Sequence, residues 1–349
     1  MSGLETLLRA LPKVELHVHL EGSIRPEMAI RLAQRRGIVL PGMDRGVEGL
    51  REEFRFTSFQ DFIRLYVVLS SAMVEAEDFA EVVEDVAQAL ARQGVRYAEM
   101  TFTPMSHIAR GVAEATLFAG LAEGRVRALE GHDVQISWVF DIVRCFPDQA
   151  IPTLEMALRQ RRAGNCVVAL GLGGPEGPQW PACAPLREAF ARAKAEALHR
   201  VPHAGEQTGS WSVREAVDCY HAQRIGHGFR SVEDPALLHE LAENGISLEL
   251  CPGSNVTLGM VPSLAKHPLP TIDAAGVRWS LASDDPPMFG TSLLDEYRNC
   301  ATQWGWSAEK LLSVAEAAVE QSFLSEGAKQ ALLAEQREVF AREYLGILA

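Results

Sequence analysis

Apolar segments rich in β-branched and aromatic residues recur along the chain and alternate with Ala- and Leu-rich stretches of helical spacing. Strands that alternate with helices predict parallel βα units, because a crossover must return the chain to the start of the next strand. The candidate strands are VELHVHL (14–20), VRYAEMTF (95–102), VQISWVFDI (134–142), CVVALGLG (166–173), HRVPHAG (199–205), RIGHGF (224–229), ISLELCP (246–252) and VRWSLAS (277–283). Eight such units predict an α/β fold, a (β/α)₈ TIM barrel. An open doubly wound sheet is the alternative, but no G-x-G-x-x-G turn follows an early strand.

The chain of 349 residues has the length of one barrel with insertions, so we expect residues 1–349 to form a single domain. The longest gap between candidate strands, about residues 24–94, contains several helical segments and predicts a helical insertion after the first strand. In barrel enzymes such insertions cap the mouth of the active site. The Glu-, Ala- and Leu-rich segment after about residue 306 predicts extra C-terminal helices.

Polar residues gather where the candidate strands end. His17 and His19 alternate with apolar residues in the first strand, so both point to the same side. The fifth strand ends in His203-Ala-Gly-Glu206, the sixth carries His227, and Ser283-Asp284-Asp285-Pro286 ends the eighth. Each residue has an ordinary structural explanation: a core histidine, a helix N-terminal acid or an N-cap. Because the carboxyl ends of barrel strands form one mouth, their joint occurrence predicts a catalytic site there.

Three histidines and one carboxylate suit Zn²⁺ with a further position open for water. A zinc ion lowers the pKa of bound water from about 15.7 to near 7. Glu206 and the remaining aspartate are then available for proton transfer and substrate contact. The chain lacks H-E-x-x-H, which argues against a metalloprotease with that motif. It also lacks H-x-E with P-C-x-x-C, which argues against a cytidine-deaminase-type zinc enzyme.

Composition excludes several kinds of partner. The net charge of −13 disfavours nucleic acid and anionic membranes, which both need a positive surface. The sequence contains no apolar run of membrane-spanning length and no signal-peptide pattern. Its six cysteines are irregularly spaced and form no C-x-x-C, so we expect free thiols and a reducing cytoplasm. The expected partner is a small-molecule substrate, and the oligomeric state stays open.

PKVELHVHLEGS, HAGE, RIGHG and SDDP, in this order, resemble the adenosine deaminase family of the amidohydrolase superfamily over nearly the whole chain. The resemblance implies a zinc-bearing barrel, with one Zn²⁺ per chain, that hydrolyses the 6-amino group of a purine. It implies these zinc ligands: His17, His19, His203 and Asp284. Glu206 would protonate purine N1, and His227 would orient and deprotonate the water. The reaction itself calls for an acid at this position, because attack at C6 puts negative charge on N1 and a proton from the acid neutralises that charge.

The resemblance also implies substrate contacts. Asp285 would bind N7, and Gly174 would offer its backbone N–H to N3. Phe59 and Phe62 resemble a hydrophobic gate over the purine, although a helix packing its apolar face on the barrel explains them equally well. Glu21 stands where adenosine-specific members carry an aspartate that contacts the ribose 5′-hydroxyl, and GLGGPE replaces their DLAGDE.

Adenine-specific members share this glutamate but tend to read SSE near Gly174 and DDPAYF rather than DDPPMF. Two other readings compete with a mononuclear purine nucleoside deaminase. Binuclear amidohydrolases commonly bridge two metals with a carboxylated lysine that ends strand four, but none of the five lysines here ends a candidate strand at the mouth. A non-catalytic barrel would have lost a ligand or the acid, and neither is missing. The sequence therefore predicts deamination of adenosine or of a modified adenosine such as 6-aminodeoxyfutalosine, with adenine as the alternative.

Overall fold

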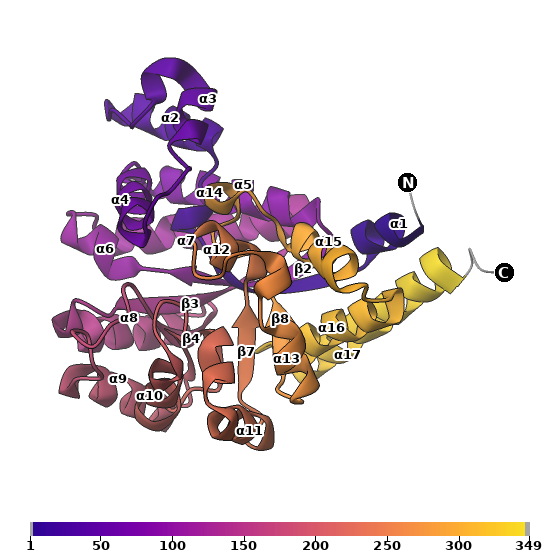
Figure 1. Cartoon of the computed structure of the whole chain (residues 1–349). Helices are drawn as coiled ribbons and strands as arrows, with labels where there is room; N and C mark the ends of the chain where they lie inside the picture. Colours follow the sequence, from indigo (N-terminus) through magenta and orange to yellow (C-terminus); the bar gives the residue numbers. More distant parts are fainter. Residues whose placement is uncertain (1–2, 346–349) are drawn as a thin grey trace.

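Eight parallel strands form the centre of the molecule in a computed structural model that describes residues 3–345. They pair in sequence order, from β1 beside β2 to β7 beside β8 (Figure 1). The strands are β1 (Lys13–His19), β2 (Val95–Phe102), β3 (Gln135–Val143), β4 (Val167–Gly173), β5 (His199–Ala204), β6 (Arg224–His227), β7 (Ser247–Leu250) and β8 (Trp279–Leu281). Backbone bonds from His19 N to Asp284 O (3.0 Å) and from Asp284 N to His17 O (2.9 Å) join the first strand to the segment after the last. The predicted (β/α)₈ TIM barrel is confirmed.

The predicted strands and the observed ones coincide to within about three residues at each end. The later strands are shorter than predicted: β6 stops at His227 rather than residue 229, and β8 at Leu281 rather than residue 283. Their last predicted residues leave the hydrogen-bonded ladder as the chain turns into the mouth of the barrel. Of the polar residues predicted at strand ends, the histidines lie within β1, β5 and β6, whereas Glu206, Asp284 and Asp285 lie on the turns after β5 and β8.

Helices surround the barrel and cover its outer face (Figure 1). Those of the first two thirds of the chain are α1 (Gly3–Ala10), α2 (Pro26–Arg36), α3 (Gly46–Glu52), α4 (Phe59–Ser70), α5 (Ala76–Ala91), α6 (Pro104–Ala109), α7 (Glu114–His132), α8 (Ala150–Arg162), α9 (Ala184–Ala195) and α10 (Ser210–Tyr220). The remainder are α11 (Pro235–Glu243), α12 (Pro252–Thr257), α13 (Leu269–Ala274), α14 (Pro286–Phe289), α15 (Leu293–Trp304), α16 (Ala308–Gln321) and α17 (Glu326–Phe340). The C-terminal helices predicted from composition are confirmed, and α16 packs against β1 and β8.

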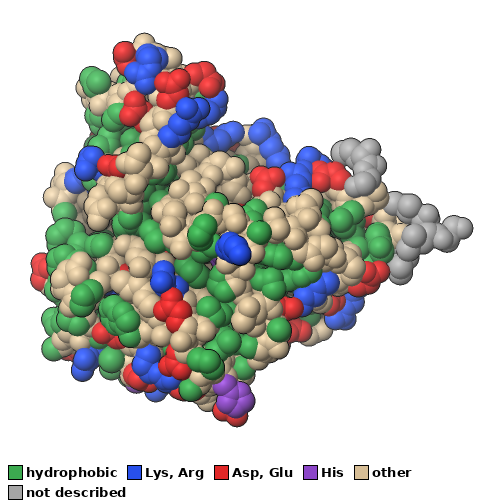
Figure 2. Space-filling model, in the orientation of Figure 1, with side chains coloured by type: hydrophobic (Ala, Val, Ile, Leu, Met, Phe, Trp, Pro, Cys, Tyr) green, Lys and Arg blue, Asp and Glu red, His purple; other side chains and the backbone are tan. Residues whose placement is uncertain are grey.

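The insertion after β1 divides into three structural parts. Helices α2 and α3 project from the body of the molecule as an arm (Figure 1). Positive and negative side chains intermingle on the face of this arm drawn in Figure 2, and Arg51 pairs there with Glu27 (2.9 Å). Helix α5 packs against α7 and β2, as an ordinary outer helix of the barrel does. Within residues 24–94, the side chains that line the cavity at the mouth belong to α4.

Strand β1 is buried on both faces, as a strand inside a barrel must be. Val14 and Leu16 pack with Ala318 and Val319 of α16, on the outer face of the sheet. Because side chains alternate along a strand, His17 and His19 face the interior. The six cysteines are free thiols. Across residues 3–345, no helix combines the length and apolar character needed to cross a membrane.

Candidate active site

A cavity of about 360 Å³ opens at the carboxyl ends of the strands. This volume lies within the range of small-molecule sites. One side is polar and is lined by six residues from the predicted set: His19, His203, Glu206, His227, Asp284 and Asp285. The other side is mostly apolar and includes α4, which contributes Phe59, Phe62, Ile63, Tyr66 and Val67. The structure therefore brings the predicted chemical groups and the predicted gate into one cavity.

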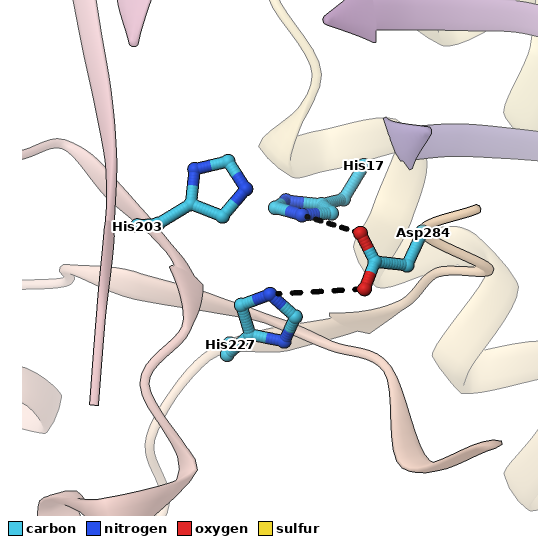
Figure 3. Close-up of side chains that lie close together, drawn as sticks. All are labelled: His17, His203, His227 and Asp284. Carbon is cyan, nitrogen blue, oxygen red and sulfur yellow. Dashed lines mark ion pairs between the residues drawn. The ribbon is translucent and has the colours of Figure 1, made fainter. Parts of the chain in front are cut away.

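Three histidines and an aspartate converge beneath the cavity floor (Figure 3). They come from β1, β5, the end of β6 and the turn after β8: His17, His203, His227 and Asp284. One donor atom from each lies within 4.8 Å of the others, and all four side chains are buried. His17 Nε2 is 3.5 Å from Asp284 Oδ1, and His227 Nε2 is 3.9 Å from Asp284 Oδ2. This is a chemically suitable donor set for a zinc ion.

The fourth predicted ligand, His19, is the last residue of β1. Its Nε2 is 3.1 Å from Nε2 of His203 and 3.3 Å from Oδ1 of Asp284. Two ligands that bind one ion at about 2.1 Å in a tetrahedron lie about 3.4 Å apart. The buried Nε2 of His17 has no hydrogen-bond partner in the protein. These distances and the unpaired ring nitrogen fit a divalent metal ion in this cluster. The four-residue group whose donor atoms lie within 4.8 Å of one another contains His227 rather than the predicted His19.

Two of these residues adopt backbone conformations that only glycine adopts easily. His227 has φ = 59° and Asp284 has φ = 64°, both in the left-handed region. Such conformations cost of order 1–3 kcal/mol each and concentrate at functional sites. Gly22 is required on steric grounds, because a Cβ at that position would lie 1.5 Å from Oδ1 of Asp285. The Glu-Gly turn after β1 thereby leaves room for the second aspartate.

Glu206 and Asp285 are buried carboxyl groups at the edge of the metal cluster. Burial, together with the charges of Asp284 and Glu176, raises the pKa of Glu206 to about 8. Burial and the charge of Asp284 raise the pKa of Asp285 well above its usual range. Oε1 of Glu206 lies 3.8 Å from Nε2 of His227. A carboxyl group that keeps its proton at neutral pH can serve as a general acid.

The loop that carries Glu206 is held by a glutamate that sequence analysis did not single out. Glu176 accepts hydrogen bonds from the backbone N–H of Glu206 (3.4 Å) and from the backbone and hydroxyl of Thr208 (3.1 and 2.6 Å). Glu176 lies just after Gly174, which lines the cavity with φ = 88°. The β4 and β5 loops are therefore fixed relative to each other.

Phe59 and Phe62 both line the cavity from α4. Phe62 is buried, and its ring centroid lies 5.0 Å from that of Phe289 in the β8 loop. Phe59 is half-buried and lies 5.6 Å from Phe62. Helix α4 begins at an N-cap, Ser58, whose hydroxyl accepts from the backbone N–H of Asp61. The positions suit both explanations offered above, a gate and a packed helix face.

Glu21 does not line the cavity. Its side chain is 1 % exposed and accepts bonds from Tyr66 Oη (3.2 Å), Thr103 N (2.9 Å) and His107 Nε2 (3.3 Å). Arg110 donates to Nδ1 of His107 (3.0 Å), which leaves the proton on Nε2 facing Glu21. The carboxylate is therefore fully used within the protein. Tyr66 and Thr103, which both bond to Glu21, line the cavity in its place.

Buried charges behind the cluster were also missed by the sequence analysis. Oε2 of Glu249 lies 2.7 Å from Nδ1 of His17, and Arg224 pairs with both Glu249 (2.7 Å) and Glu99. Asp141, at the end of β3, lines the cavity 3.9 Å from Nδ1 of His203. A charged residue inside an otherwise apolar strand was the available signal for Glu99, Asp141 and Glu249.

The profile of the family described as Adenosine deaminase matches residues 12–339. This chain belongs to the adenosine deaminase family. It is accordingly a deaminase, a hydrolase that acts on C–N bonds. The barrel and the buried histidine and aspartate cluster agree with the zinc-bearing barrel that the sequence resemblance implies.

Relatives of this adenosine deaminase family member carry two different names. An aminodeoxyfutalosine deaminase of Streptomyces coelicolor is 39% identical over 344 residues, covering 98% of this chain and 87% of that protein. An adenine deaminase of Cupriavidus necator is 39% identical over 290 residues, covering 83% and 81%. The comparison therefore places the chain in a group of deaminases without deciding between the two substrates.

Solved structures support the same fold. The adenine deaminase from Arthrobacter aurescens superposes with a TM-score of 0.87 at 33% identity, covering 94% of this chain and 99% of that one. An amidohydrolase from Burkholderia ambifaria, solved with bound Zn, gives a TM-score of 0.88 at 22% identity, covering 98% and 94%. The second likeness concerns the fold alone.

Proposed function

We propose that this chain is a zinc-dependent hydrolytic deaminase of a 6-aminopurine nucleoside whose 5′ end differs from that of adenosine, such as 6-aminodeoxyfutalosine. The observation that carries the proposal is the division of the cavity. Its polar side holds the groups that would read and protonate a purine ring. On its other side, the acid expected to meet a 5′-hydroxyl, Glu21, is already bonded to three protein donors.

In this proposal one metal ion is held by four residues: His17, His19, His203 and Asp284. When bound, zinc supplies an activated water near neutral pH by lowering the pKa of that water. The protein's part is to fix the four donors in a buried, rigid pocket. Glu249 behind His17 orients the imidazole so that Nε2 faces the ion, in the manner of carboxylate–histidine–metal arrangements.

Glu206 acts as the general acid. The water oxygen forms a bond to C6 while the carboxyl proton of Glu206 passes to N1, which absorbs the electron pair displaced from the ring. The C6–N bond then breaks. One proton of the water goes to the amino group, which leaves as ammonia, and the other restores the carboxyl group of Glu206. The products are the 6-oxopurine and NH₃, which balance substrate plus one water. Asp285 hydrogen-bonds N7, and the backbone N–H of Gly174 meets N3.

The cavity wall expected to face the sugar favours a nucleoside substrate with an altered 5′ end. Tyr66 stands between Glu21 and the cavity, and its hydroxyl already donates to that carboxylate. Val67 and Phe146 also line the cavity, and both are large hydrophobic side chains left about half exposed, at 47% and 50%. An apolar substituent on the nucleoside would cover them, whereas a bare 5′-hydroxyl would not.

Phe59 and Phe62 would close over the purine and keep bulk water from the reacting centre. They lie on α4, whose residues form the apolar wall of the cavity. Excluding water strengthens the hydrogen bonds that Glu206 and Asp285 make to the ring. Two alternatives remain under test: deamination of free adenine, which the names of several relatives favour, and a binuclear amidohydrolase reaction on another substrate.

An ammonia-release assay tests the proposal with four substrates: adenine, adenosine, 5′-deoxy-5′-substituted adenosines and 6-aminodeoxyfutalosine. The zinc-loaded protein should release ammonia from the modified nucleosides with the highest kcat/KM. Glu206→Gln is the matched control, because it keeps the size and polarity of the acid but cannot donate a proton to N1. Release of ammonia from none of these purines, or release that survives in Glu206→Gln, would remove the proposed chemistry.

A further inference from the structure

The imidazole of His227 is held from behind by an amide. The side chain is 1% exposed, and its Nδ1 lies 3.3 Å from Nδ2 of Asn255. Its other nitrogen, Nε2, faces the site, 3.8 Å from Glu206 Oε1 and 3.9 Å from Asp284 Oδ2. Whether Nε2 carries a proton decides whether this residue can donate a hydrogen bond, accept a proton or bind a metal ion.

A hydrogen-bond chain that begins at a backbone amide fixes that proton. The N–H of Leu269 can only donate, and it points at Nδ1 of His267 (3.1 Å). Nδ1 of His267 must therefore be unprotonated, and its proton lies on Nε2. That nitrogen is 3.1 Å from Oδ1 of Asn255, which accepts the bond. Burial lowers the pKa of His267 to about 4, so the ring is neutral at pH 7.

The direction of hydrogen-bond donation continues from Asn255 to His227 in the active site. With its oxygen turned toward His267, Asn255 presents its NH₂ group to Nδ1 of His227, which must accept. A protonated Nδ1 would place two donors against each other in a buried site, and burial of unpaired polar groups is costly. A neutral His227 then carries its proton on Nε2.

We infer that His267 and Asn255 are positioning residues that hold His227 in the Nε2–H tautomer, with that N–H directed into the active site. His227 is therefore a hydrogen-bond donor to the attacking oxygen, and its Nε2 has no lone pair for a metal ion. This separates it from His17, His203 and Asp284, although its donor atom lies within 4.8 Å of theirs.

The inference narrows the role expected for His227 from family resemblance. The residue can orient the water, but Nε2 cannot take the water's proton while it already holds one. Glu206 can take that proton once its own has passed to N1, since its Oε1 lies 3.8 Å from Nε2 of His227. The catalytic consequence rests on the proposed function, whereas the position of the proton does not depend on any substrate.

Nitrogen NMR of the zinc-loaded protein, labelled with ¹⁵N-histidine, tests the proton position directly. Protonated, unprotonated and metal-bound ring nitrogens give distinct ¹⁵N shifts, and the spectrum of His227→Gln identifies the signals of His227. We expect an unprotonated Nδ1 and a protonated Nε2. A protonated Nδ1, or a metal-bound Nε2, would overturn the inference whether or not any purine is deaminated.

Two variants test the relay. Asn255→Asp keeps the size of the side chain but offers only acceptors, so His227 should move its proton to Nδ1, and kcat should fall by about 10²-fold with little change in KM. His267→Gln retains an N–H donor for Asn255 and should preserve both the wild-type ¹⁵N pattern and kcat within a few-fold. An unchanged His227 signature in Asn255→Asp would refute the relay. If that variant fails to fold, the spectrum of the native protein still decides the tautomer.

Discussion

Nδ1 of His17 lies 2.7 Å from Oε2 of Glu249, and both side chains are almost fully buried. Glu249 also receives a hydrogen bond from Arg224 (2.7 Å), which pairs in turn with Glu99. Burial alone would lower the pKa of His17, but the carboxylates of Asp284 and Glu249 raise it well above its usual value. A buried carboxylate thus fixes the orientation of an imidazole in the candidate metal cluster.

We predict that Glu249→Gln weakens zinc binding by about 10- to 100-fold, the usual effect of removing an outer-shell partner of a metal ligand. Competition with a zinc chelator measures the change. The control is Glu296→Gln, which alters another buried carboxylate that bonds Gly253 N and Thr291 and contacts none of the ligands. Equal zinc affinity in wild type and Glu249→Gln would show that Glu249 does not support His17.

Part of this network could be predicted from the sequence, and part depends on the tertiary structure. His17 and His19 were predicted because alternation in one strand places them together, and the barrel brings strand ends to one mouth whatever their separation in sequence. Glu249 and Glu99 were not predicted, because their partners lie on other strands and pairing depends on the register of the sheet. Glu99 and Arg224 are 125 residues apart, and no local pattern links them.

Glu21 illustrates a second limit. Its place in the sequence indicated a substrate contact. Its hydrogen-bond partners come from α4, the end of β2 and α6, and only the tertiary structure shows that these groups bond to its carboxylate. The same holds for His267, which bonds to Asn255, and for Asn255, which bonds to His227. Strand and helix boundaries followed from periodicity and turn residues, whereas the hydrogen-bond direction within the site did not.

The metal content of the purified protein should be about one zinc ion, or one similar divalent ion, per chain, since the ligands form one site. His203→Ala should lose metal and activity together, because the imidazole supplies a donor at the centre of the cluster. Elemental analysis after dialysis gives the stoichiometry. Two tightly retained ions per chain would contradict the mononuclear site.

The pH dependence of kcat should reflect the acid form of Glu206. Because burial raises its pKa to about 8, the carboxyl group stays protonated at neutral pH, and activity should fall as pH rises through that value. Glu206→Gln should retain its metal and lose at least about 10²-fold in kcat. An alkaline limb that persists unchanged in the residual activity of this variant would assign the titration to another group.

Tyr66→Phe should separate nucleoside recognition from purine chemistry. The variant leaves Glu21 short of one donor and changes the wall that faces the sugar. Because this wall would hold the sugar side of the nucleoside, its change should lower kcat/KM for the modified nucleoside by about 10-fold, the scale of a modest change in a binding pocket. Turnover of free adenine should change far less. A parallel loss for both substrates would show that Tyr66 does not distinguish the sugar side.

The division of the cavity into a purine end and an altered sugar end is tested most directly by comparing kcat/KM for adenine, adenosine and 5′-modified nucleosides with the same zinc-loaded preparation. A site built around one polar group can reject an analogue that lacks its partner by about 10⁴-fold. We predict that a nucleoside with a large 5′ substituent in place of the hydroxyl, such as 6-aminodeoxyfutalosine, has the highest value. If adenosine or free adenine is turned over far faster than every modified nucleoside, the sugar-side assignment is wrong.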